Sequence, residues 1–530
     1  MRSGPFVLAL SVATASLWPV PPAAAPSAAH ADVFTTSEQC AVCHSAAPGA
    51  TAMRSPLGDD ISPYGLWQGT MMANSFRDPY FRAQLEKETA AAGAAVQELC
   101  LRCHAPMASH GAVLAGGAAP RLADVDGDLA ADDGVSCTVC HAIAADGLGD
   151  LASFSGQPQF DRKRRLFGPF ADVAVRPMQG QVNYTPTHGP HVQRAALCGS
   201  CHTLITEHQG VAFAEQTPYL EWRNSEFSDE AGASPTARTC QQCHMADVGP
   251  ARIARTPMGV DYTIPARDGY RAHAFVGGNA FVLSLLQSHR DELDVTAEPE
   301  AIDRMIQATR RQLAEQTARL EIGAIERDGG AAAFAIRVEN RTGHKFPTGY
   351  PARRAWLHIA VTQGDSLVFE SGAFDRDGRL VGVDDPQRVP HVATVTSERD
   401  VVVYELVAAD PAGVPTTHLT RMVQRQKDNR LLPRGFRSDG PHVTDTAPVG
   451  TDGDADFTGG SDTVACRVPL PEGGRGRIVV QATLYYQPVP PHWVDALREV
   501  DGDATRRFVA MYDAADKEPD VVATAVRAAR

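Results

Sequence analysis

The alternation of apolar and polar side chains divides the chain into two parts with different periods. From residue 318 onward, apolar residues recur at every second position in short stretches separated by Gly, Asp and Pro. A period of two is typical of a β-strand that buries one face. The stretches with this period are 318–325, 332–340, 355–362, 366–371, 400–407 and 477–486. Six or more such strands predict a β-sandwich over residues 318–490.

The preceding part, residues 32–295, shows little strand alternation, many loop-forming residues and short helical stretches such as 78–91. Apolar residues return at helical spacing in 276–293, and 297–317 predicts a long helix with a polar face. We interpret residues 296–317 as a connecting helix. Residues 491–530 predict one or two helices with a frayed end, which is a C-terminal helical tail. The expected fold class is therefore α+β multidomain, with a loop-rich α-helical domain followed by a β-sandwich.

Residues 1–31 have the pattern of a secretory signal peptide. A short basic start is followed by an apolar run and by small residues ending in Ala29-His30-Ala31, an A-x-A-like cleavage site; Ala23-Ala24-Ala25 is a second possible site. The apolar run is short for a membrane span, which needs about 20 residues, so an uncleaved anchor is the weaker alternative. We expect an exported bacterial protein, periplasmic or secreted, with no transmembrane segment after signal removal.

One five-residue pattern, C-x-x-C-H, occurs five times between residues 40 and 244. The motifs are Cys40–His44, Cys100–His104, Cys137–His141, Cys198–His202 and Cys240–His244. C-x-x-C-H is the attachment pattern for c-type haem, because its two thiols can form thioethers with one porphyrin and its His can bind the iron as proximal ligand. Random placement of the 11 Cys and 18 His of the chain would give roughly 0.008 such motifs.

The alternatives to haem are zinc sites and disulfides. Paired C-x-x-C units can supply four zinc ligands, but a His after every pair has no role in such sites. The motifs therefore predict five covalently bound haem c groups and a multihaem cytochrome c domain over residues 32–295. The predicted thioether residues are Cys40, Cys43, Cys100, Cys103, Cys137, Cys140, Cys198, Cys201, Cys240 and Cys243. The predicted proximal iron ligands are His44, His104, His141, His202 and His244.

The ligand on the other side of each iron decides the function. A strong protein ligand gives an electron-transfer centre, whereas an open position permits catalysis. The helical domain has further histidines that could fill these positions, namely His110, His188, His191, His208 and His273. His110 follows His104 too closely to reach its own haem easily, but it could reach a neighbouring one.

Several local patterns resemble the multihaem cytochrome c superfamily that contains tetrahaem cytochromes of nitrifiers and hydroxylamine oxidoreductase. The segment 67–73 is similar to a W-x-x-S-x-H-A pattern whose His is a distal ligand, with Met72 at that position and Met71 beside it. His191 lies shortly before a haem motif, as a distal His of the family does, and His188 is its competitor. The segment beginning at His273 is similar to another ligand segment.

The segment 340–351 resembles a G-H-K-x-P-T-G turn in the C-terminal domains of such cytochromes and contains His344. The resemblance therefore implies distal ligands at Met72, His191, His273 and His344, and His110 completes five candidates. Each has an ordinary alternative, because Met72 can be core filler and His344 a buried structural residue.

These patterns predict a protein that transfers electrons through its haems. One alternative is an oxidoreductase that acts on a small nitrogen or sulfur compound at a haem without a strong distal ligand. Another is a structural or sensory module of an outer-surface conduit. The formal charge of −14, from 49 Lys and Arg against 63 Asp and Glu, disfavours nucleic acid and favours basic patches on redox partner proteins.

Two further features of the sequence are interpreted as structural and not functional. The eleventh cysteine, Cys466, falls in a strand pattern and predicts a buried structural thiol. The runs Asp124–Asp128 and Asp452–Asp456 have D-x-D-x-D spacing, but neither continues into a complete calcium loop with Gly at position 6 and Glu at position 12. We expect both runs to be solvated acidic turns.

Overall fold

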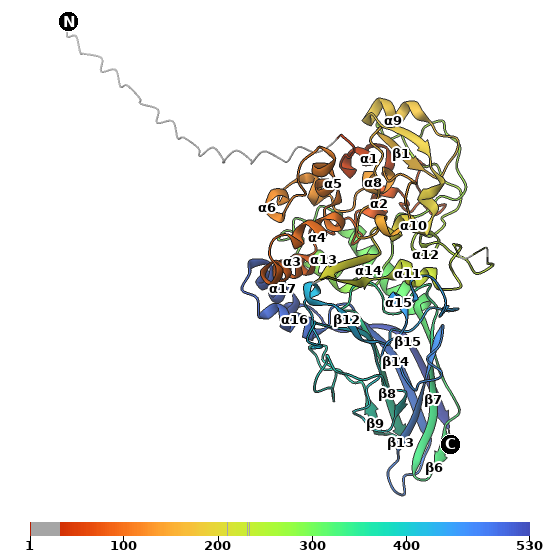
Figure 1. Ribbon diagram of the computed structural model, residues 1–530. Coiled ribbons are helices and arrows are strands. Elements are labelled where there is room, and N and C mark those ends of the chain that lie inside the picture. The colour runs from red at the N-terminus through yellow and green to blue at the C-terminus, as the bar shows by residue number, and fades with distance from the viewer. Residues whose placement is uncertain (2–31, 209, 231, 233, 530) are drawn as a thin grey trace.

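The computed structural model describes Met1 and residues 32–208, 210–230, 232 and 234–529. The expected signal peptide therefore lies, apart from Met1, outside the described residues. Figure 1 shows a helical half and an elongated half made of sheets, which confirms the α+β multidomain class. No helix in the described ranges has both the length and the apolar character that a membrane crossing requires.

The helical half consists of short helices joined by loops. The longest of its early helices, α3 (Pro79–Ala92), begins where the carboxylate of Asp78 accepts the N–H groups of Tyr80 and Phe81, as expected of an N-cap. It ends at Gly93, whose φ of 84° favours glycine. The other helices are α1 (Ser37–His44), α2 (Pro63–Trp67), α4 (Val96–His104), α5 (Pro106–Leu114), α6 (Leu122–Val125), α7 (Leu129–Asp132), α8 (Cys137–His141), η1 (Leu151–Ser153), α9 (Val175–Val182), η2 (Pro190–Gln193), α10 (Ala195–Gly199), α11 (Pro218–Arg223) and α12 (Cys240–His244).

Among the described residues, apolar side chains near the loops of this half form several small clusters. The described residues of the helical half contain two pairs of short strands. β1 (Arg165–Gly168) pairs with β2 (Thr185–His188) in parallel, and β3 (Leu204–His208) pairs with β4 (Val211–Gln216) antiparallel. The half is therefore built from local turns and loops, in agreement with the weak periodicity of its sequence.

The helix predicted over 297–317 is present as α14 (Pro299–Gln312) followed by the π-helical turn η3 (Leu313–Thr317). It packs with α13 (Ala280–Ser288), α3 and two helices from the end of the chain, α16 (Pro491–Arg498) and α17 (Asp503–Ala514). The cluster they share contains Leu286, Ile302, Leu497 and Phe508. The helices α16 and α17, which come shortly before the last strand, thus complete a helical layer of the first half (Figure 1).

The two sheets of the other half confirm the predicted sandwich. One has the strand order β10-β13-β7-β5 with β6 paired to β7, and the other has the order β12-β11-β8-β14-β15 with β9 paired to β8. Both sheets contribute to one buried cluster, for example through Ile336 and Val464 from the first and Ile359 and Val480 from the second. The strands are β5 (Ala318–Ile322), β6 (Glu326–Asp328), β7 (Ala331–Asn340), β8 (Arg354–Gln363), β9 (Ser366–Ser371), β10 (Thr394–Val395), β11 (Val403–Ala409), β12 (Gln424–Asp428), β13 (Ser461–Pro469), β14 (Ile478–Gln487) and β15 (Asp520–Ala529), with the short helices η4 (Leu419–Arg421) and α15 (Val443–Thr446) between them.

The prediction of a helical tail with a frayed end over 491–530 is wrong for its last part. The two helices are present, but the chain then forms β15, which pairs antiparallel with β14 along its whole length. The reason lies in its composition, because the strand has no regular alternation of large apolar and polar residues: only Val522 is fully buried, whereas Val521 and Val526 are exposed. The eleventh cysteine, Cys466, is buried in β13 as predicted, and burial raises the pKa of its thiol to about 12.

A buried ionic network joins the two halves. The Asp428 carboxylate lies 2.7 Å from the Nζ of Lys345 and 2.8 Å from the Nε of Arg430, and the guanidinium of Arg430 also pairs with Glu221 of α11 at 3.1 Å. Burial alone would raise the pKa of Asp428, but Arg430 and Lys345 hold it well below its usual range. Two buried carboxylates are thus paired with two buried cations, and the partly buried Arg425 adds a third cation 3.3 Å from Asp428.

We predict that Asp428→Asn destabilises the protein by about 3–5 kcal/mol, because it leaves two buried cations without their shared anion. The measurement is the guanidinium midpoint of the haem-containing protein, followed by the circular dichroism of its sheets. Since the folded pKa lies below the ordinary value of 3.8, this stability is present above that pH and is lost as the pH falls. The matched control is Asp385→Asn, whose partner Arg388 is exposed, and equal midpoints for the two variants would contradict the prediction.

Candidate haem sites

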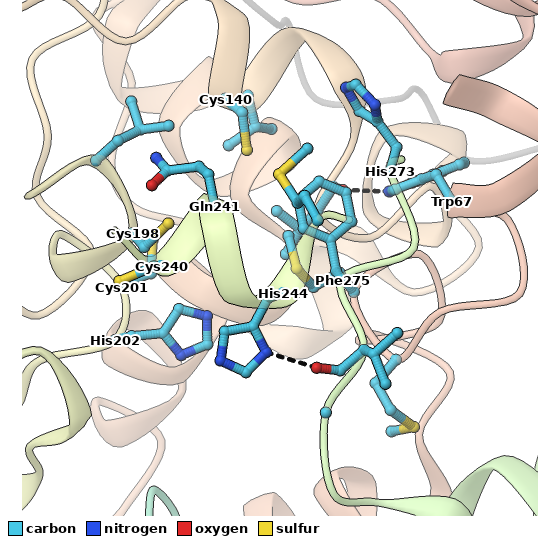
Figure 2. A pocket seen from close by; sticks show the side chains of 18 of the residues that line it. Trp67, Cys140, Cys198, Cys201, His202, Cys240, Gln241, His244, His273 and Phe275 are labelled. Atoms are coloured by element: carbon cyan, nitrogen blue, oxygen red, sulfur yellow. Dashed lines mark hydrogen bonds between the residues drawn. The ribbon is translucent and has the colours of Figure 1, made fainter. Parts of the chain in front are cut away.

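A single connected cavity of about 1340 Å³ lies among the helices and reaches the near end of the sandwich. All fifteen cysteine and histidine residues of the C-x-x-C-H motifs border it, although the motifs are spread over more than 200 residues of sequence. Figure 2 shows part of its lining, where Cys140, Cys198, Cys201, His202 and His244 surround one space. The fold therefore brings the five motifs to one place.

Each motif lies on or next to a helical turn, which explains how its thiols face the same way. α1 and α4 end at the His of their motifs, α8 and α12 coincide with theirs, and α10 ends inside the fourth motif. Residues three apart on a helix project from the same face, so both cysteines of a pair can face one side of the cavity.

Four of the five motif histidines are oriented by a backbone carbonyl. The Nδ1 atoms of His44, His104, His141 and His244 lie 2.6–3.0 Å from the carbonyl oxygens of Ile253, Ser75, Phe167 and Val276. The carbonyl oxygen accepts a hydrogen bond from Nδ1–H, so the proton of the neutral ring is on Nδ1 and Nε2 keeps its lone pair. This is the arrangement that orients metal-binding histidines. Burial also lowers the pKa of His104 and His202 to about 4, so both rings are neutral at pH 7.

Two of the candidate distal ligands face motif histidines across the cavity. The ring centres of His141 and His273 are 6.3 Å apart with planes 22° from parallel, and those of His244 and His344 are 6.2 Å apart with planes 14° from parallel. A metal–nitrogen bond of about 2.0 Å plus roughly 1.2 Å from nitrogen to ring centre, taken on both sides, separates two axial imidazole centres by about 6.4 Å. The spacing of both pairs therefore matches a single metal atom between them.

The outer nitrogens of these two rings are also paired. The Nδ1 of His273 lies 3.0 Å from the carbonyl oxygen of Arg271, and that of His344 lies 2.8 Å from the carbonyl oxygen of Lys345. Both rings are thus oriented by a hydrogen bond from Nδ1 to a backbone carbonyl, as the motif histidines are, and Nε2 is left for a metal.

The other three candidates differ from one another. Met72 borders the cavity, but His110 and His191 are not among its lining residues. The Nε2 of His191 already lies 2.9 Å from the carbonyl oxygen of Ile143, and the His110 ring is hydrogen-bonded to the backbone of Arg102 and Gly156. These contacts favour the ordinary structural role for His110 and His191, so we do not retain them as proposed ligands.

His208 of β3 borders the cavity instead, and sequence reasoning noted it without placing it among the ligands. Its Nε2 is buried and has no hydrogen-bond partner among the described residues. Nearby, Glu215 of β4 is buried beside Cys100, and burial raises the pKa of its carboxyl to about 7. The sequence assigns no chemical role to Glu215, because only the folding of β4 places it beside the second motif.

Thiols of different motifs also contact one another. Cys40 is hydrogen-bonded to Cys137, Cys103 to Cys201, and Cys198 to Cys240. Cys140 interacts with Cys201 and Cys198 as well. In space, the first motif is thus next to the third, the third is next to the fourth, and the fourth adjoins the second and the fifth.

Comparisons with known proteins agree with this geometry. Residues 39–142, which contain the first three motifs, match the family model described as cytochrome c554 and c-prime. A search of curated proteins finds no match. The crystal structure of a penta-haem cytochrome c552 from Thermochromatium tepidum is similar over 94% of this chain and 100% of its own, with a TM-score of 0.55 and 17% identity. The TM-score and the coverage show a shared fold, and the family match together with the five motifs supports a multihaem c-type cytochrome.

Proposed function

We propose that this protein is an exported cytochrome c that transfers electrons through five covalently bound haems. The observation that carries the proposal is the convergence of all fifteen motif residues on one cavity. Haem iron supplies one-electron chemistry when it is bound, by changing between Fe(III) and Fe(II). The protein's contribution is to hold the thiols, orient the imidazoles and exclude water.

The donor atoms present fit this cofactor. Each motif offers two thiols beside a helical turn and a histidine, and in four of those histidines Nδ1 is paired with a carbonyl so that Nε2 is left for a metal. A zinc site would need four ligands at bonding distance from one atom. The described residues offer only one group of three or more His, Cys, Asp or Glu close enough to hold an ion, and it lies in the sandwich and contains no cysteine.

Contacts between motifs support transfer from one haem to the next. Because thiols of the first and third, second and fourth, and fourth and fifth motifs interact with one another, haems held by these motifs would be neighbours. Cys140 extends the same proximity to the third and fourth motifs. No motif is isolated from the others, which is the arrangement that stepwise electron transfer requires.

The axial ligands that we propose are His273 opposite His141 and His344 opposite His244. Both pairs have the spacing, the near-parallel planes and the Nδ1 partners described above. Met72, which borders the cavity, is proposed as a third distal ligand. Two strong protein ligands on an iron favour electron transfer at these positions over catalysis at an open haem.

Export and partner choice complete the proposal. The pattern of residues 1–31 is that of a signal peptide, and we propose a periplasmic location. With a formal charge of −14, the surface favours redox partner proteins that present basic patches. Association with them is expected to weaken as ionic strength rises.

The haem count is tested by intact-protein mass spectrometry of the purified protein. We expect the polypeptide mass plus five haem groups, and a loss of one haem group when Cys240 and Cys243 are both changed to Ser. A secreted polypeptide without added tetrapyrrole mass would contradict the proposed function.

The axial ligands are tested by electron paramagnetic resonance of the oxidised protein. We expect His273→Ala and His344→Ala each to convert one low-spin haem to a high-spin or water-bound form, because each removes one strong ligand. The matched control is His191→Ala, which changes a buried histidine whose Nε2 is held by a carbonyl and should leave the spin-state count unchanged. A spin-state change in His191→Ala, or none in His273→Ala, would reverse the assignment.

A further inference from the structure

Three carboxylates converge in the sandwich, outside the haem cavity. Asp454 and Asp456 belong to the turn before β13, and Asp462 belongs to β13 itself. One carboxylate oxygen from each lies within 4.8 Å of the other two. Asp462 is 0% exposed, and the side chain of Asp454 is 5% exposed.

This cluster has an excess of buried negative charge. The Oδ2 of Asp462 accepts the Tyr404 hydroxyl at 2.7 Å, but its Oδ1 is buried and has no hydrogen-bond partner. The Oδ2 of Asp454 accepts the Nε2 of His391 at 2.7 Å. Within the described ranges, no lysine or arginine forms an ion pair with any of the three aspartates. A buried carboxylate oxygen without a partner, such as the Oδ1 of Asp462, is costly, and a cation bound among the three carboxylates would satisfy it.

We propose that Asp454, Asp456 and Asp462 bind a divalent cation of the calcium class. Calcium prefers oxygen ligands at 2.3–2.6 Å, so two oxygens on one ion lie at most about 5 Å apart, and the three carboxylates satisfy this condition. His391 donates a hydrogen bond to Asp454 and orients its carboxylate, as residues around a metal site orient its ligands.

The position of the third carboxylate explains why residues 452–456 do not continue into a complete calcium-loop pattern in the sequence. In the D-x-D-x-D run, Asp454 and Asp456 face the cluster, but Asp452 is not among its members. The third carboxylate comes from the following strand, where β13 begins by pairing with β7. The expectation of a solvated turn is therefore replaced for this run, whereas in the other run the exposed Asp126 pairs with the partly buried Arg82.

The cluster adjoins the segment that links the two halves. The Nδ2 of Asn429 lies 3.1 Å from the Nδ1 of His391, and the N–H of Gly460 donates to the carbonyl of Leu432. Between Asn429 and Leu432 lies Arg430 of the ionic network. A bound cation would fix the turn against this segment, so its expected effect is on stability and not on electron transfer.

The test uses the haem-containing protein after treatment with EDTA and dialysis. Titration with CaCl₂ in a calorimeter is expected to show saturable binding of one Ca²⁺ per chain. Saturating Ca²⁺ is expected to raise the melting temperature of the sheets by about 5–10 °C. Asp462→Asn should weaken Ca²⁺ binding at least tenfold. The matched control Asp452→Asn changes the same acidic run outside the cluster and should bind as the unaltered protein does.

Should Asp462→Asn not fold, Asp456→Asn replaces it, because Asp456 is exposed and its substitution leaves no buried group unpaired. The proposal is overturned if the unaltered protein shows no saturable binding, or if Asp452→Asn loses as much affinity as the cluster variants. It is also overturned if Asp462→Asn raises the melting temperature equally with and without Ca²⁺, since the carboxylates would then share protons and not a cation.

Discussion

The helical half depends on a space that its own side chains do not fill. Around the C-x-x-C-H motifs its apolar residues form small separate clusters, and the cavity between them is bordered by every thiol of the motifs. A void of that size would lose both burial and dispersion energy if no large apolar group occupied it. Covalently attached macrocycles would fill the cavity with apolar surface. Short helices with little hydrophobic periodicity are then sufficient to form the core of this half.

The sandwich contributes a proposed ligand, His344, as well as stability. His344 lies on a turn bounded by Asn340, whose side-chain amide donates to the carbonyls of His344, Leu431 and Leu432. The N–H of Lys345, the next residue, donates to Glu221 of the helical half at 3.0 Å. A buried ionic network is seldom a better source of stability than apolar packing, but it fixes register. Here it fixes the distance between His344 and the fifth motif, on which the proposed axial ligation depends.

Sequence reasoning predicted features that are local or strongly periodic. The C-x-x-C-H motifs contain their chemistry within five residues, and strands such as β7 and β14 have clear alternation. It missed β15, because small residues on an edge strand alternate weakly in hydrophobicity. It could not rank His191 against His273, since both are histidines in similar surroundings in the sequence. Only the tertiary partner of each Nε2 separates them, a carbonyl for His191 and a facing imidazole for His273.

Asp428 and Asp462 show how the same burial has opposite consequences. Both are fully buried in the sandwich. Asp428 is surrounded by Lys345, Arg430 and Arg425, which keep its pKa well below its usual range, whereas burial raises the pKa of Asp462 to about 6. One carboxylate has its cations built into the chain, and the other has as neighbours a tyrosine, a histidine and two further carboxylates. Because the two sites are connected through the segment that contains Asn429 and Arg430, a counter-charge supplied at Asp462 would act on the same interface that Asp428 already holds together.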